Sequence, residues 1–548
     1  MAVVYIVILI GVLVFVHEFG HYLAARIFHV KVEHFSIGFG PKLYSFKRWD
    51  TNWEVRALPL GGYVQMLGME FEEVTDRTHP DYAHAYNNKP IWQKAVINLA
   101  GPLFNLLLPI PILFAVYLGT VTDDIMPRVG QVLDSSPAVG ILEPGDMITS
   151  IDGKPVRYWT TVHDEIAARP NETLKVGILR DGQALEVQVT PEEATSRDVL
   201  DVNVRKIGRV GITPDLAPAV IGLTSTHGLA ARHGLASFDE VTSVDGQPVR
   251  SYPDLESAIR HHSGDVMKIV ALRPQKLDVA YGTVNILKRI EVEIPGEVSL
   301  EAMGIASANM FLSEVDDKSP AAKAGLQAGD RILEADGKSM SVFRSFVDRL
   351  ATNWEEPHTL LVQRGDEVFT TTIQLEKVTI VGEFQEERPV IYAGFYQKSP
   401  YVVPERVKMS SGDRFAYAGR TAVNSTVTAS GMLVVYLGQM VRGKVSTKSL
   451  GGPIMIGHMA SKAGADGLDA FMRMLAVISI NLGIINLVPI PLLDGGKLAI
   501  LLVEAIKRGP ISMRARQIIA YVGLAMVAML LLLAFKNDIE RLWNLFFS

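Results

Sequence analysis

The feature that most restricts the fold of this chain is a polar motif inside an N-terminal apolar run. Residues 3–16 are uninterrupted by any charged or amide side chain, and the apolar run continues for several turns around His17, Glu18 and His21. A run of this length is about what a helix needs to cross a bilayer. Because no basic residue precedes it, the run predicts a retained membrane helix over 1–28 and argues against a cleaved signal peptide.

The composition indicates a chain that is part membrane and part soluble. Hydrophobic residues make up 48% of it, yet 20% of the residues are charged and need water. The net charge of -6 provides no broad basic surface, which excludes nucleic acid as a partner. Since the chain has no cysteine, a metal ion could be held only by His, Asp or Glu side chains.

Three further apolar segments predict membrane helices at 95–118, 471–494 and 518–536, with a C-terminal tail at 537–548. The resulting fold class is a membrane protein with an α-helical core of four spans.

Another apolar segment, 427–441, is too short to be a fifth span. At about 1.5 Å per residue it covers about 22 Å, and polar residues are scattered along it. It therefore predicts an amphipathic helix that lies in the membrane interface, within a linker region at 383–470.

A repeated pattern fills the region between the second and third spans. Asp146, Asp239 and Asp330 each begin a strand that leads into an Asp-Gly turn, a second strand and a helix. The copies are roughly 90 residues apart, the size of one small domain. The pattern predicts three inserted α+β domains, at 125–215, 216–298 and 299–382.

His17 and His21 are four residues apart, so a helix presents both on one face. Two imidazoles on one face suit a zinc ion, and a neighbouring carboxylate that is not a ligand, here Glu18, can accept a proton from water. The alternative is a chance match. Ionisable residues are costly within a membrane span and mark function by default, which favours the zinc site.

A third ligand is expected far along the chain, at Asp494. The segment before it contains Pro489 and Pro491, which prevent a regular helix and leave polar backbone groups exposed at membrane depth. Such backbone is tolerated only inside protein or beside a water-filled site. The alternative is a polar turn at the end of a helix.

The distribution of basic residues predicts the orientation of the chain. Lys and Arg residues are frequent in the loops at 29–94 and 495–517, so both loops are expected on the cytoplasmic side. His17, His21 and Asp494 then all lie toward the cytoplasmic ends of their spans. The three inserted domains and both termini lie outside the cytoplasm.

An intramembrane His-Glu-x-x-His motif paired with a distant Asn-x-x-Pro-x-Pro-x-Leu-Asp-Gly motif resembles the site-two protease family, and the inserted domains narrow this to the regulator-of-sigma-E protease branch. Three further segments support the resemblance: Asn98 to Pro102, Leu58 to Val64 and Gly451 to Ile454. The inserted domains are similar to bacterial PDZ domains through Ser136-Pro137-Ala138 and Ser319-Pro320-Ala321; the middle copy lacks this tripeptide.

The resemblance implies a zinc metalloendopeptidase of the bacterial inner membrane. His17, His21 and Asp494 would bind Zn2+, and Glu18 would be the general base. The implied substrates are membrane-spanning proteins already shortened by another protease, of the anti-sigma factor type, together with signal-peptide remnants.

The resemblance also implies two substrate-binding residues, Asn486 and Asn481. A hydrolysed helix must first unwind, and an edge strand can bind the extended segment; the loop over 53–66 is the expected strand. The PDZ-like domains could capture peptides. Three copies are present where two are usual in the family.

Two other classes of function compete with this one. A non-catalytic membrane scaffold that displays PDZ-like domains has no use for Glu18 beside two histidines on one helical face. A transporter is disfavoured because the sequence contains one proline-broken segment and no inverted repeat of it.

Overall fold

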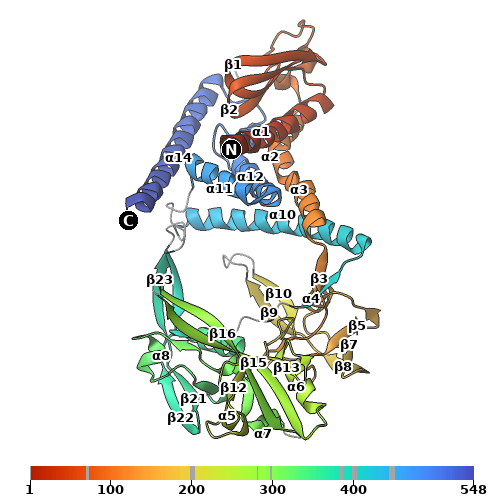
Figure 1. Cartoon of the computed structure of the whole chain (residues 1–548). Coiled ribbons are helices and arrows are strands. Elements are labelled where there is room, and N and C mark those ends of the chain that lie inside the picture. Colours follow the sequence, from red (N-terminus) through yellow and green to blue (C-terminus); the bar gives the residue numbers. More distant parts are fainter. Residues whose placement is uncertain are drawn as a thin grey trace. The chain divides into compact units, whose positions relative to one another are not determined.

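The computed structural model describes residues 2–69, 73–197, 204–279, 282–296, 299–381, 387–397, 402, 404–443 and 451–547. The chain divides into two compact units (Figure 1). One contains both ends of the chain and the other contains most of residues 123–408. We describe each unit by itself.

The first unit contains four helices that are long and apolar enough to cross a membrane, at Val4–Ile27, Ile91–Thr120, Leu468–Leu487 and Arg514–Glu540. The first of these belongs to α1 (Ala2–Ile27), which continues without a break through the His-Glu-x-x-His motif. Side chains in it that are neither apolar nor small are concentrated at that motif, so the helix combines a span with a polar site.

The second span is longer than the predicted 95–118. It consists of α2 (Ile91–Leu107) and α3 (Pro109–Thr120), joined at Leu108, which keeps helical backbone angles. The helix begins directly after Pro90, which occupies the N-cap position with an extended backbone. α1 and α2 approach closely at glycine: a Cβ added to Gly20 would lie 2.5 Å from the Ala100 carbonyl oxygen. Small residues at such crossings allow tight packing in membranes.

The third span ends earlier than the predicted bound of 471–494, at the point where the two prolines predict a break in the helix. α12 (Leu468–Leu487) stops before Pro489, and Asp494 begins a separate helix, α13 (Asp494–Lys507). The region 495–517 is therefore mostly helical, although it was predicted as a loop. Two prolines end α12, while Gly495 and Gly496 let α13 start against the turn, because a Cβ on either would lie 2.3 Å from a carbonyl oxygen.

The predicted boundaries at 518–536 and 537–548 also need correction. α14 (Met513–Phe547) is one continuous helix that includes the predicted tail. The linker over 383–470 contains two helices, α10 (Ser411–Val441) and α11 (Pro453–Asp466), so the predicted segment 427–441 is the second half of a longer helix. α10 begins after Ser410, whose side chain caps the helix by accepting a hydrogen bond from the Asp413 backbone N–H.

A β-hairpin follows α1 in the first unit and consists of β1 (Val32–Arg48) and β2 (Thr51–Met66) (Figure 1). Ser36 pairs with both Glu54 and Tyr63, so these two parts of β2 lie on opposite sides of β1. The stretch from Gly62 to Met66 is therefore an edge of this sheet. No third strand pairs with it among the residues that the structure describes.

The second unit contains three modules of the same design, as the repeat predicts. Each has a four-stranded antiparallel sheet and a helix of nine or ten residues beside a buried apolar core. In the first module the sheet order is β6-β5-β7-β8, with β6 at Lys154–Pro155, β7 at Leu174–Arg180 and β8 at Gln183–Val189. In the second it is β14-β13-β15-β16, with β14 at Gln247–Pro248, β15 at Val266–Val279 and β16 at Gly282–Pro295. In the third it is β20-β19-β21-β22, with β20 at Lys338–Ser339, β21 at His358–Arg364 and β22 at Glu367–Ile373. The central strands are β5 (Met147–Ile151), β13 (Glu240–Val244) and β19 (Arg331–Ala335), and the helices are α4 (Trp159–Ala167), α6 (Tyr252–Arg260) and α9 (Phe343–Thr352).

Each repeated aspartate is buried and forms a two-point ion pair with an arginine. The pairs are Asp146 with Arg180, Asp239 with Arg273, and Asp330 with Arg364. This accounts physically for the aspartate that the repeat places before each central strand: a carboxylate can be buried when a bidentate guanidinium pairs with it.

The second and third modules extend beyond their predicted C-terminal ends. The second module continues past 298, because β17 (Ile305–Ser307) pairs with β12 (Ile221–Leu223) and Ile305 lies in the module's core. The third continues past 382, because β25 (Phe395–Tyr396) pairs with β18 (Glu314–Val315). Each closing strand comes late in the sequence, after a long hairpin, and the repeat pattern contains no signal for it.

Candidate metal centre

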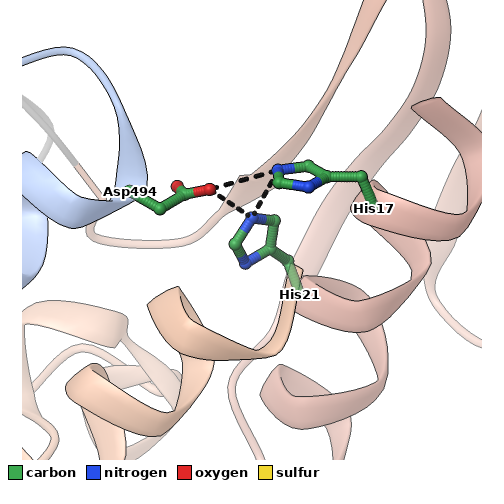
Figure 2. Close-up of side chains that lie close together, drawn as sticks. All are labelled: His17, His21 and Asp494. Atoms are coloured by element: carbon green, nitrogen blue, oxygen red, sulfur yellow. Dashed lines mark hydrogen bonds and ion pairs between the residues drawn. The ribbon is translucent and has the colours of Figure 1, made fainter. Parts of the chain in front are cut away.

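His17, His21 and Asp494 converge at one point although they come from opposite ends of the chain (Figure 2). Asp494 Oδ2 lies 3.1 Å from His17 Nε2 and 3.3 Å from His21 Nε2, and the two Nε2 atoms are 3.3 Å apart. All three side chains are buried. The structure therefore brings together all three residues that the sequence singles out as metal ligands.

The spacing of these donor atoms fits a tetrahedral metal ion. With ligand bonds of about 2.0–2.1 Å, neighbouring donors around tetrahedral zinc lie about 3.3 Å apart. The separations of 3.1–3.3 Å match this edge length. Two imidazoles and one carboxylate also form a common donor set for zinc sites that keep a fourth position open.

His21 is held in a defined orientation by α2. Its Nδ1 lies 2.8 Å from the backbone oxygen of Ile97, an acceptor, so Nδ1 carries the proton and the Nε2 lone pair faces the other donors. The ring fits only because residue 101 is glycine, since a Cβ there would lie 2.3 Å from His21 Nε2. The segment from Asn98 to Pro102, noted in the sequence, thus shapes the metal centre.

Asp494 reaches the site because of the irregular turn before it. Leu492 has φ of +93°, a conformation that is rare for residues with a Cβ. The Leu493 backbone N–H donates to the Ile490 carbonyl, which closes the turn and directs the start of α13 toward α1. On the far side of the carboxylate, Lys497 Nζ lies 3.5 Å from Asp494 Oδ1.

A pocket of about 240 Å³ opens beside the three donor residues. Glu18 and Asn486 line it, and so does the edge of β2 at Gly62, Tyr63 and Val64. Asn486 Nδ2 lies 3.5 Å from both ring nitrogens of His17. The pocket therefore combines the donors, a free carboxylate and a strand edge.

Asn481 is not among the residues that line this pocket in the part of the chain described. It lies on α12, before Asn486, and is half-buried. The structure thus brings Asn486 to the site and does not bring Asn481 there.

Two polar residues at the site belong to neither of the motifs that predict it. One is Lys497, which in the sequence contributes only to the basic region 495–517. The other is Asn105 on α2, whose Nδ2 lies 3.2 Å from His17 Nδ1. A signal for it existed, since an amide side chain within an otherwise apolar span usually has a reason to be there.

Comparison with known proteins assigns the chain to a family. The model of peptidase family M50 matches residues 5–530. Regulator of sigma-E protease RseP from Escherichia coli is 29% identical over 544 residues, covering 98% of both chains. A Thermotoga maritima protein, whose name describes a candidate zinc metalloprotease, is 28% identical over 563 residues and covers 100% of both.

One solved structure matches a short part of the chain. The PDZ domain of an SdrC-like protein from Listeria monocytogenes is 22% identical, with a TM-score of 0.14, and the match covers 17% of this chain and 90% of that domain. Since the family model matches nearly the whole length, and the metal-ligand motif lies within the match, this protein belongs to peptidase family M50.

Proposed function

We propose that this protein is an intramembrane zinc metalloprotease. Its substrates would be membrane proteins already shortened by another protease, of the anti-sigma factor type, and remnants of signal peptides. The observation that carries the proposal is the arrangement of His17, His21 and Asp494 at the edge length of tetrahedral zinc, with both histidines on a helix long enough to span a membrane. Membership of a peptidase family and relatives named as metalloproteases support it.

His17, His21 and Asp494 would hold the zinc ion, which when bound acidifies a water molecule and polarises the carbonyl of the scissile bond. All three donors are buried and directed at one another. Burial keeps competing solvent away and strengthens electrostatic interactions with the bound group.

Glu18 would be the general base. It lines the same pocket but is not one of the three converging donors, so its carboxylate stays free to accept a proton from water. The same carboxylate can then give this proton to the leaving amine. Lys497, which also lines the pocket, lies 3.5 Å from Asp494 Oδ1, so its ammonium group pairs with the third ligand.

The edge strand from Gly62 to Met66 would bind the substrate as an added strand. Its residues line the pocket, and its free edge faces no other strand among the described residues. A substrate helix has to unwind before hydrolysis because its carbonyls are hydrogen-bonded internally, and strand addition satisfies the backbone groups that unwinding releases. Asn486 would hold the substrate next to the metal. Asn481, which precedes it in α12, would bind the substrate farther from the metal.

We also propose the placement in the cell. The chain would lie in the bacterial inner membrane with four spans, the metal centre toward the cytoplasm and the three PDZ-like modules outside it. The basic residues of 29–94 and 495–517 support this orientation. Peptides could bind at the modules, and the overall process would be regulated intramembrane proteolysis.

The test compares membrane fractions from cells that carry the wild-type protein or Glu18→Gln. Membrane-anchored fragments that persist only with Glu18→Gln identify the substrates, and zinc content should be equal in both proteins. Glu405→Gln, a change outside the first unit's pocket, serves as a control and should leave the fragment pattern unchanged. A non-catalytic scaffold predicts identical fragments in all three samples, and that result would overturn the proposal.

A further inference from the structure

Asn105 is a buried amide that contacts the outer edge of a proposed zinc ligand. It is 0% exposed, and its Nδ2 lies 3.2 Å from His17 Nδ1. Its Oδ1 has no hydrogen-bond partner in the described part of the chain. The two nitrogens of the His17 ring thus have different nearest groups: Asp494 and His21 at Nε2, and Asn105 at Nδ1. Asn486 Nδ2 is farther away, at 3.5 Å from each nitrogen.

A histidine that binds metal through Nε2 must carry its proton on Nδ1, and this proton needs an acceptor. His21 meets the requirement through the Ile97 carbonyl oxygen at 2.8 Å. For His17 the group in the corresponding position is the Asn105 carboxamide. With the amide nitrogen facing Nδ1, Nδ1 is the acceptor and the His17 proton lies on Nε2, between the metal donors.

The two ends of a carboxamide have nearly the same shape, so their assignment depends on hydrogen bonding. A half-turn of the Asn105 carboxamide brings the unpartnered Oδ1 to His17 Nδ1. It gives the Nδ1 proton an acceptor and frees the Nε2 lone pair. Either orientation leaves one end of the carboxamide without a partner among the described residues, so the requirement of the metal ligand decides between them and favours Oδ1 at His17 Nδ1.

We propose that Asn105 is a positioning residue that accepts the Nδ1 proton of His17 through Oδ1 and so directs His17 Nε2 at the metal. This inference rests on the proposed function, because it assumes that zinc binds at His17, His21 and Asp494. It adds a residue outside the ligand set that controls how tightly the ion is held.

The backbone of Asn105 is itself fixed from a second helix. The Ser479 hydroxyl on α12 donates to the Asn105 carbonyl oxygen at 2.7 Å, and Ser479 is fully buried. This bond ties α2 to the helix that ends near Asn486. An amide intended only for helix packing has no need to face an imidazole nitrogen, whereas the Ser479 bond already links the two helices.

The test measures zinc affinity of the full-length protein in detergent by competition with a chelator. Asn105→Leu should weaken zinc binding about 10- to 100-fold, the usual effect of losing a partner of a metal-bound histidine. Asn105→Asp should bind zinc within a few-fold of the wild type, because a carboxylate keeps the acceptor and removes the donor. Ser479→Ala is the matched control: it deletes a buried hydrogen bond to the same residue but keeps the carboxamide, and its zinc affinity should be near that of the wild type.

Two outcomes would overturn the inference. The first is wild-type zinc affinity in Asn105→Leu. The second is an Asn105→Asp protein that binds zinc as weakly as Asn105→Leu, which would mean that the amide acts as a donor or as packing. Thermal unfolding of the metal-free proteins separates misfolding from loss of the ligand contact. A wild-type protein that binds no zinc at all would instead contradict the proposed function.

Discussion

Asp494 Oδ2 lies 3.1 Å from Nε2 of His17, and the two residues come from opposite ends of the chain. The contact joins the first span, α1, to the start of α13, just after the proline-broken end of α12. Two buried side chains at this distance require either a shared proton or a shared cation. The contact gives a reason for the irregular segment from Val488 to Leu493: this turn between α12 and α13 places Asp494 next to His17.

Asp494→Ala should reduce bound zinc to a small fraction of one ion per chain, because two imidazoles alone are an incomplete ligand set. Metal content of the purified protein, measured by atomic absorption, checks this. Asp469→Ala removes an exposed aspartate at the start of α12 and should keep the metal. Full zinc occupancy in Asp494→Ala would rule out Asp494 as a ligand.

Gly101→Ala should weaken zinc binding and cleavage by about 10-fold or more, since a Cβ would lie 2.3 Å from His21 Nε2 and the ring would have to move. Gly119→Ala, in the same span, is the matched control because nothing lies within 4 Å of its added Cβ. Chelator competition on both variants measures the difference. Equal affinities would show that the His21 ring is free to move aside.

The hairpin beside the site should lose stability in acid. Burial by itself raises the pKa of Glu54, but hydrogen bonds from Lys42, Arg56 and His34 outweigh it and lower the pKa to about 2. The charged form therefore stabilises the fold above the ordinary value of 4.5, and this stabilisation is lost as the pH falls from there toward 2.

Hydrogen exchange of the β1 and β2 amides, corrected for intrinsic rates, should show weaker protection at about pH 3 than at about pH 5. Glu54→Gln should reduce protection at the higher pH and remove most of the difference between the two. A wild-type hairpin that is equally protected at both values would contradict the prediction.

Arg273→Met should destabilise the second module by about 3–5 kcal/mol, because it leaves the fully buried Asp239 carboxylate without its partner. Arg260→Met removes an exposed arginine whose ion pair with Asp181 spans 3.6 Å, and about 0–1 kcal/mol is expected. Limited proteolysis of the full chain across a urea series compares the two variants. Similar urea midpoints for the two variants would contradict the prediction and indicate that the Asp239 carboxylate is neutralised without Arg273.

Much of this protein follows from local patterns in its sequence. Apolar runs long enough for a bilayer predict the spans, and His17, Glu18 and His21 share a helix, so their spacing alone defines one side of the metal centre. The three modules are equally local, because each repeated aspartate and Asp-Gly turn lies within one sheet. Short-range periodicity records which face of an element is buried, and that is enough for these features.

The two motifs predict that Asp494 joins His17 and His21, but the sequence does not provide the other contacts between elements far apart in the chain, nor the distances at the site. Only the tertiary structure puts Asp494 at the N-terminus of α13, turns Asn105 toward His17, and makes Gly62 to Met66 an open edge beside the pocket. The closing strands of the second and third modules were missed for the same reason, since their partners lie far upstream. Such contacts depend on how helices and strands pack, and a one-dimensional pattern does not contain the distances that packing creates.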